Sequence, residues 1–281
     1  MVRVSRNIPA AVARRLRQEA GFGCCECGNP ILQYHHIVEW SEDQHFRPED
    51  MMVLCPTHHD KATKGAMPEA EQRRLKANPH NIQRGLAKGL LAVKQDYCAA
   101  NFGSVTVIGD GPFLRMNGED ILGFNIGDNN LQISLRLFSE ADELLVEIDR
   151  NEWISGDPLP WDIEADWQVL TLRERARQIS LSLNAKAVPI EIRAELWRAG
   201  KRVLLDSNGI SIGAKRALVV GFADMALVGM TLDVDTEKFS FGPPPQNPHA
   251  AIVSWPNIRE RLWKAKDAWK KIEVARNAKA D

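Results

Sequence analysis

The apolar residues of this chain follow two different periods, and the period changes close to residue 100. In residues 9–20 the apolar positions Val12, Leu16 and Ala20 fall on one helical stripe. After Phe102 apolar and polar residues alternate instead. Because a helix repeats every 3.6 residues and a strand every two, the sequence predicts a head that contains helices, followed by a domain of strands.

The alternation is strict in residues 131–137, 179–183 and 190–196. Alternation over several segments indicates an antiparallel sheet with one face in water and the other in a core. Turn signals such as Asn117-Gly118 separate these segments. We therefore expect about ten short strands that close into an antiparallel β sandwich or roll.

Helices are expected on both sides of this β domain. The pattern predicts helices at residues 69–77 and 81–92 before it, and an amphipathic helix at residues 257–279 after it. A stiff segment beginning Gly242-Pro-Pro-Pro leads to the last helix. The expected class is α+β. Its four parts are a small N-terminal domain (1–95), the antiparallel β domain (96–241), a Pro-rich spacer (242–256) and the C-terminal helix (257–281).

Length and composition describe an ordinary globular chain. A chain of 281 residues can form two domains with separate cores, and 44% hydrophobic with 26% charged residues is typical of such proteins. The N-terminus lacks the apolar run of a signal peptide, and the apolar segment 217–232 is short and contains Asp224, so no membrane span is expected. Cysteines at metal-binding spacing favour a reducing compartment. We expect a cytoplasmic protein.

The net charge of −1 conceals an uneven distribution. Residues 1–95 carry 14 Lys and Arg against 10 Asp and Glu, and residues 257–281 carry 8 against 4, whereas residues 96–256 carry 14 against 23. A polyanion is therefore expected to bind the head of the chain rather than its acidic middle. The excess is modest and would not by itself indicate nucleic acid.

Residues 23–65 hold four of the five cysteines and five of the seven histidines. Cys24-x-x-Cys27 opens this stretch, and Cys55-x-x-His58 closes it. Two such pairs are the usual way to place four ligands around one tetrahedral Zn²⁺. The four residues are therefore predicted to hold a structural zinc.

Four further histidines in this stretch are not needed by a four-ligand zinc site. His45 lies in the variable loop and is assigned no chemistry, which leaves His35, His36 and His59. His35 and His36 lie in residues 31–38, which predict one arm of a hairpin, so their side chains should point to opposite faces. Cys25 is expected to be a buried thiol, although an exchange of zinc ligands with it stays open. The surplus histidines are the candidates for chemistry.

The stretch resembles the HNH, or ββα-metal, family of nucleases in three successive segments: YHHI at residues 34–37, DMMVLC at 50–55 and CPTHHDK at 55–61. The resemblance covers residues 8–90 and rests on order, spacing and residue type together. It implies a small ββα-metal domain and a metal-dependent endonuclease that hydrolyses phosphodiester bonds in DNA.

The resemblance also implies a role for each surplus histidine. His36 is expected to be the general base, and His35 and His59 are expected to hold a divalent metal. The family more often has an acid at the position of His35, and nitrogen ligands suit Mn²⁺, Ni²⁺, Co²⁺ or Zn²⁺ better than Mg²⁺, so the identity of the metal stays open. Asp50 is expected to hold the loop and orient the base; its alternative is a helix N-cap.

Basic side chains near the histidines are candidates for phosphate contacts. They are Arg14 and Arg15 in the first helix, and Lys61 and Lys64 in and just after the helix that begins at Pro56. The alternative for all of them is a solvated surface, and Arg17 is expected to be largely exposed as well.

Two other functions stay open: a zinc-stapled module that binds nucleic acid without cutting it, and a nuclease that acts on RNA. By analogy alone, a nuclease fused to a β domain is similar to effectors of bacterial defence or mobile elements. The β domain and the C-terminal helix are expected to regulate, to bind a partner or to form a homo-oligomer, and the sequence does not distinguish these.

Overall fold

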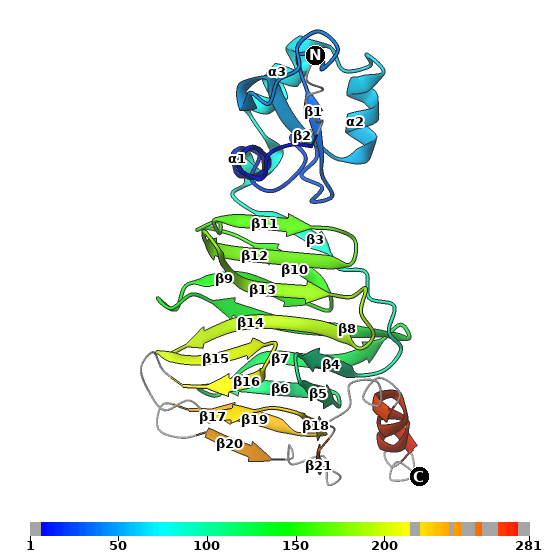
Figure 1. Cartoon of the computed structure of the whole chain (residues 1–281), viewed down its shortest axis with the longest axis vertical. Helices are drawn as coiled ribbons and strands as arrows, with labels where there is room; N and C mark the ends of the chain where they lie inside the picture. The colour runs from blue at the N-terminus through cyan, green and yellow to red at the C-terminus, as the bar shows by residue number, and fades with distance from the viewer. Residues whose placement is uncertain (1–6, 214–219, 236–238, 243–250, 255–263, 275–281) are drawn as a thin grey trace.

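The computed structural model describes residues 7–213, 220–235, 239–242, 251–254 and 264–274. It is an α+β protein in which strands dominate, which confirms the expected class at this level. Figure 1 shows a small domain of helices and two strands seated against one end of a long β domain.

The N-terminal domain surrounds a short antiparallel hairpin with helices. Its elements are α1 (Ala10–Glu19), β1 (Gln33–His36), the 3-10 helix η1 (Pro48–Asp50), β2 (Met51–Leu54), α2 (Pro56–Thr63), α3 (Glu69–Ala77) and α4 (His80–Arg84). All four residues of β2 are buried, and they form one small apolar core with Leu16 of α1 and Leu75 of α3. A core of this size needs an additional staple such as a metal.

The β domain consists of two sheets. The first contains β3 (Ala87–Leu90), β6 (Gly111–Met116), β7 (Glu119–Gly127), β8 (Asn130–Phe138), β9 (Leu144–Asp149), β10 (Glu152–Ser155), β19 (Thr231–Val234) and β20 (Phe239–Gly242). The second contains β4 (Ala99–Phe102), β5 (Val105–Ile108), β11 (Asp162–Ala165), β12 (Val169–Arg175), β13 (Gln178–Asn184), β14 (Ile190–Arg198), β15 (Lys201–Asp206), β16 (Gly209–Ile212), β17 (Val220–Phe222), β18 (Met225–Val228) and β21 (Ala251–Ser254).

Strand order places β3 and β11 at sheet edges. The first sheet runs β20-β19-β6-β7-β8-β9-β10-β3, and the main path of the second runs β11-β12-β13-β14-β4-β5-β18-β21, with β15, β16 and β17 continuing from β14. In Figure 1 the edge strand β11 lies next to the N-terminal domain. Within the described residues the first sheet has 8 strands and the second has 11, well above the number expected from alternation.

One apolar core fills the space between the sheets. In β8, Leu131, Ile133, Leu135 and Leu137 are buried, as the alternation predicted. They belong to the same buried cluster as residues of the second sheet, such as Leu183 of β13. The two sheets therefore pack face to face.

The sheets are not wholly antiparallel, which corrects that part of the expectation. β14 pairs in parallel with β4, β18 with β5, and β19 with β6. Each of these pairs joins strands that are far apart in the chain. Alternation within one strand reports which face is buried and carries no information about the direction of a distant neighbour.

The expected helix at residues 81–92 is too long. The helix ends at Arg84, because Gly85 takes a left-handed conformation with φ of 66°. The next residues form β3, which pairs with β10. The β domain therefore begins before the expected boundary at residue 96.

The C-terminal part differs as well. β21 lies inside the expected spacer at residues 242–256 and pairs with β18, and most of the remaining spacer falls outside the described residues. Of the expected helix at residues 257–279, the structure describes residues 264–274, which bury Trp269 and Ile272 in the β core. Within this part the helix packs on its own chain. Among the described residues, no helix combines the length and apolarity needed to cross a membrane.

Candidate metal centres

Cys24, Cys27, Cys55 and His58 come together in the N-terminal domain, as their spacing predicted, with all ligand atoms within 4.8 Å of one another. Nδ1 of His58 lies 3.3 Å from Sγ of Cys24 and 3.4 Å from Sγ of Cys55. The Sγ atoms of Cys27 and Cys55 are 3.9 Å apart. Tetrahedral zinc with Cys and His ligands requires separations of roughly 3.5–3.8 Å between ligand atoms. The four side chains therefore fit one Zn²⁺.

A tight turn and a helix start create this geometry. The N–H of Gly28 donates to the carbonyl of Cys24 at 2.8 Å. Gly28 has a φ of 75°, and a Cβ there would lie 2.3 Å from Oδ1 of Asn81, so only glycine fits this turn. On the other side Cys55 directly precedes α2, and one helical turn brings His58 back beside it.

The surroundings of the cluster also suit a metal. Oε1 of Glu26 lies 3.3 Å from Nε2 of His58, which holds the imidazole with its Nδ1 towards the thiols. Burial raises the pKa of the Cys24 thiol to about 12, so a thiolate is stable there only opposite a cation.

Cys25, the alternative ligand, is outside this group. Its side chain lies in the apolar core of the N-terminal domain, and burial raises the pKa of its thiol to about 11. The interpretation of Cys25 as a buried thiol is confirmed.

The surplus histidines converge on a second site. An open cleft of about 430 Å³ is lined by Tyr34, His35, His36, Glu39, Trp40, Ser41, His59 and Thr63. The rings of His35 and His59 meet edge to face, with centroids 5.2 Å apart. His35 and His36 are successive residues of β1, and both line the cleft because the loop after β1 folds back to form part of its wall.

Gln72 of α3 fixes the orientation of His35. The amide Nε2 of Gln72 donates to the carbonyl of Met67 at 2.9 Å, which leaves its Oε1 facing Nε2 of His35 at 3.1 Å. An amide oxygen only accepts, so Nε2 of His35 carries the proton and Nδ1 carries the lone pair. Burial, followed by the nearby His59, lowers the pKa of His35 below its usual range. A neutral imidazole in this tautomer is suited to bind a metal through Nδ1.

The loop after β1 fixes the orientation of His36. Nε2 of His36 lies 3.1 Å from the carbonyl oxygen of His45, and the two rings are 5.2 Å apart. Trp40 and Phe46 complete an aromatic wall at 5.2 and 6.1 Å from the His36 ring. Since a carbonyl accepts, Nε2 of His36 carries a proton, and Nδ1 holds the lone pair of the neutral ring.

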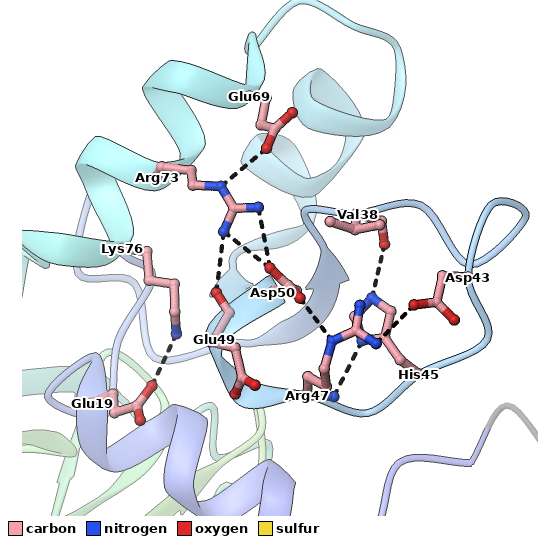
Figure 2. Close-up of polar contacts among 10 residues, drawn as sticks. All are labelled: Glu19, Val38, Asp43, His45, Arg47, Glu49, Asp50, Glu69, Arg73 and Lys76. Atoms are coloured by element: carbon pink, nitrogen blue, oxygen red, sulfur yellow. Dashed lines mark hydrogen bonds and ion pairs between the residues drawn. The ribbon is translucent and has the colours of Figure 1, made fainter.

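Asp50 holds this loop through two arginines. It accepts from Nε of Arg47 at 2.9 Å and from both terminal nitrogens of Arg73 at 3.1 Å (Figure 2). The hydrogen bond from Arg47, together with that from Arg73, holds the pKa of Asp50 below its usual range. The backbone N–H of Arg47 donates in turn to Nδ1 of His45. The carbonyl of His45 faces His36. Asp50 is the last residue of η1, so the N-cap alternative is wrong.

The basic residues expected to contact phosphate each have a partner. The pairs are Arg14 with the ring of Trp161 at 4.2 Å, Arg15 with Glu19 at 2.7 Å, Lys61 with Glu26 at 3.9 Å and Lys64 with Asp60 at 2.9 Å. Exposed ion pairs contribute little, so a polyanion can compete for Arg15, Lys61 and Lys64. The expectation for Arg17 is wrong, because it is buried against the β domain.

Three residues to which the sequence analysis gave no role complete the two sites: Glu26, His45 and Gln72. Glu26 lies between the ligands Cys24 and Cys27 in the sequence. This position is a signal from which a contact with the zinc cluster could be predicted. His45 and Gln72 lie 9 and 37 residues from the histidines that they orient. Only the folded loop and α3 bring them into contact.

The chain matches no protein-family model, no curated protein and no solved structure. The resemblance to HNH nucleases therefore rests on the sequence motifs at residues 34–37, 50–55 and 55–61, and it stays a prediction. The structure supports a Cys₃His group able to bind a structural zinc, beside a cleft lined by three histidines.

Proposed function

We propose that this protein is a metal-dependent endonuclease of the HNH type that hydrolyses phosphodiester bonds in DNA. One observation carries the proposal: three histidines outside the zinc cluster, His35, His36 and His59, line one open cleft. A module that only binds nucleic acid has no need for three imidazoles in a cleft. A phosphodiesterase needs a base and a metal site beside each other.

His36 is the general base in this proposal. Its Nε2–H faces the carbonyl of His45, so the neutral ring accepts a proton at Nδ1. A water molecule gives that proton to Nδ1 while its oxygen forms a bond to phosphorus, and the bond from phosphorus to the 3′ oxygen breaks. The leaving oxygen takes a proton from solvent. The carbonyl of His45 then stabilises the imidazolium that forms.

His35 and His59 would hold the divalent metal, and water and substrate oxygens would complete its coordination. When bound, this metal neutralises negative charge on the phosphoryl and leaving oxygens. Gln72 holds His35 as the tautomer with the lone pair on Nδ1. The zinc cluster holds the fold of the domain and takes no part in the reaction.

The test is a digest of supercoiled plasmid by zinc-loaded, full-length protein with Mn²⁺, Co²⁺, Ni²⁺, Zn²⁺ or Mg²⁺ added in turn. A structured RNA is incubated in parallel. Nicking or linearisation of plasmid that is lost in His36→Ala supports the proposal. Cleavage of RNA alone would revise the substrate class. Binding of DNA with no cleavage under any metal would leave the non-cleaving module as the function.

A further inference from the structure

A buried ion pair joins the two domains beside the histidine strand. Arg17 of α1 donates from Nε to Oδ1 of Asp162 at 3.0 Å and from Nη2 to Oδ2 at 2.8 Å. The side chains are 10% and 2% exposed, respectively. Asp162 is the first residue of β11, the edge strand of the second sheet. A two-point contact between guanidinium and carboxylate fixes orientation as well as distance.

The same guanidinium reaches the candidate active site. Nη1 of Arg17 lies 2.6 Å from the hydroxyl oxygen of Tyr34. Tyr34 directly precedes His35 in β1, and both line the cleft. Arg17 therefore links Asp162 of the β domain to the strand that carries two of the three histidines.

The cluster around this link is balanced in charge. Arg173 of β12 donates to Asp162 at 3.2 Å, and both Arg17 and Arg173 donate to Glu164 at 2.9 Å. Two arginines thus face two carboxylates. The Arg17–Asp162 pair is the buried centre of this cluster, whereas Glu164 is half exposed. Because each charge has a counterpart, the cluster favours one arrangement of the two domains.

The segment that leads into β1 is seated on both sheets of the β domain. Ile31 forms an isolated parallel bridge with Ala165 of β11. A Cβ added to Gly89 of β3 would lie 2.7 Å from Cγ of Pro30, so the edge of the first sheet is also in close contact. Two consecutive residues therefore lie against the edges of two different sheets, just before the histidine strand begins.

We infer that the β domain completes the active site, and that Asp162 is a positioning residue that acts on the histidine strand through Arg17 and Tyr34. The inference rests on the proposed function for its catalytic readout. It assigns the β domain a task in the reaction, in place of a separate regulatory role. A displacement of β1 relative to α2 would move His35 and His36 relative to His59, which lies in α2.

The experiment compares full-length Asp162→Asn, Tyr34→Phe and the double variant with the wild type. The matched control is Asp166→Asn, which removes an exposed ion pair with Lys186 just after β11. We expect Asp162→Asn to keep its zinc and its KM for plasmid and to lose kcat by about 10-fold or more, because misplacement of reacting groups is costly. Tyr34→Phe is expected to lose less, and the double variant no more than Asp162→Asn.

The ring ¹⁵N and ¹H resonances of His35 and His36 supply a second readout that needs no cleavage. They should shift in Asp162→Asn and Tyr34→Phe and stay unchanged in Asp166→Asn. If the wild type cuts no nucleic acid, the proposed function fails while these resonances still test the positioning. Unchanged resonances, or an unchanged kcat in folded Asp162→Asn, would overturn the inference.

Discussion

The zinc cluster and the histidine cleft lie close together in one small domain. They differ in how many of the ligands of a metal ion the protein itself supplies. The cluster brings four ligand atoms within 4.8 Å of one another, whereas the cleft brings three imidazoles around an open space. His58 and His59 are neighbours in α2 and still belong to different sites. Successive residues of a helix point about 100° apart, so one short helix can serve both.

In the proposed function, this difference separates a structural site from a catalytic one. Four protein ligands complete a tetrahedral zinc and leave no position for substrate. In the proposed function, His35 and His59 would be two metal ligands in the cleft and would leave further positions for water and phosphate. The contacts that orient the histidines differ in the same way. Glu26 orients His58, a ligand of the zinc cluster. Gln72 and the carbonyl of His45 orient His35 and His36, whose Nδ1 atoms remain for the cleft.

The largest effect is expected from Cys55→Ala. It removes a ligand that directly precedes α2. The zinc should therefore be lost and the N-terminal domain should unfold, because structural zinc supplies folding free energy on the order of 10 kcal/mol. Metal analysis and thermal unfolding measure the result. Cys25→Ala is the matched control, since it removes a buried thiol outside the cluster. Full zinc occupancy in folded Cys55→Ala would contradict the assignment.

The second-largest effect is expected from a substitution in the cleft that leaves the zinc cluster intact. His36→Ala should keep its zinc, its unfolding temperature and its affinity for DNA, and should lose cleavage by about 10²–10⁴-fold, because only the base is removed. His80→Ala, a histidine of α4 outside the cleft, is the control. Cleavage at the wild-type rate in His36→Ala would assign the base to another residue.

The zinc cluster could be predicted from the sequence because its ligands lie at the ends of two short motifs. Cys24 and Cys27 are held by one turn, and Cys55 and His58 by one helical turn, so local geometry determines each pair. The alternating segments of the β domain were equally readable, since burial on one face of a strand is a local property.

The rest depended on contacts between distant residues. The pattern of the first helix predicts an exposed Arg17, because this residue lies off the apolar stripe. Arg17 is buried because it contacts Asp162, which lies 145 residues further along the chain. Residues 87–90 contain no strong strand formers, so their sequence predicts helix, whereas pairing with β10 makes them the strand β3. The parallel strand pairs and the partners of His35 and His36 arise in the same way.

A smaller effect is expected when the hydrogen bond that orients His35 is removed. Gln72→Leu removes the acceptor of the Nε2–H of His35 and should lower the affinity for Mn²⁺ or Co²⁺ by about 10–100-fold while leaving the zinc in place. Calorimetric titration of the metal into zinc-loaded protein measures this. Gln83→Leu, on the exposed side of α4, is the control. Equal affinities in the two variants would show that Gln72 does not support a metal ligand.

The smallest expected effect concerns the choice of metal, and it tests directly which ligand atoms the cleft offers. With imidazoles at positions 35 and 59, wild-type cleavage should be faster with Mn²⁺, Co²⁺ or Ni²⁺ than with Mg²⁺, because nitrogen ligands suit the former ions. His35→Asp replaces one imidazole with a carboxylate and should move the preference severalfold towards Mg²⁺, which prefers oxygen. The carboxylate would face the amide oxygen of Gln72, so the overall rate should fall even as the ratio changes. The measurement is the ratio of cleavage rates in Mg²⁺ and Mn²⁺, with His35→Ala as the control that supplies neither ligand. A wild type that works best in Mg²⁺ would mean that oxygen ligands complete the site, and Glu39, the carboxylate that lines the cleft, would then be the first to replace.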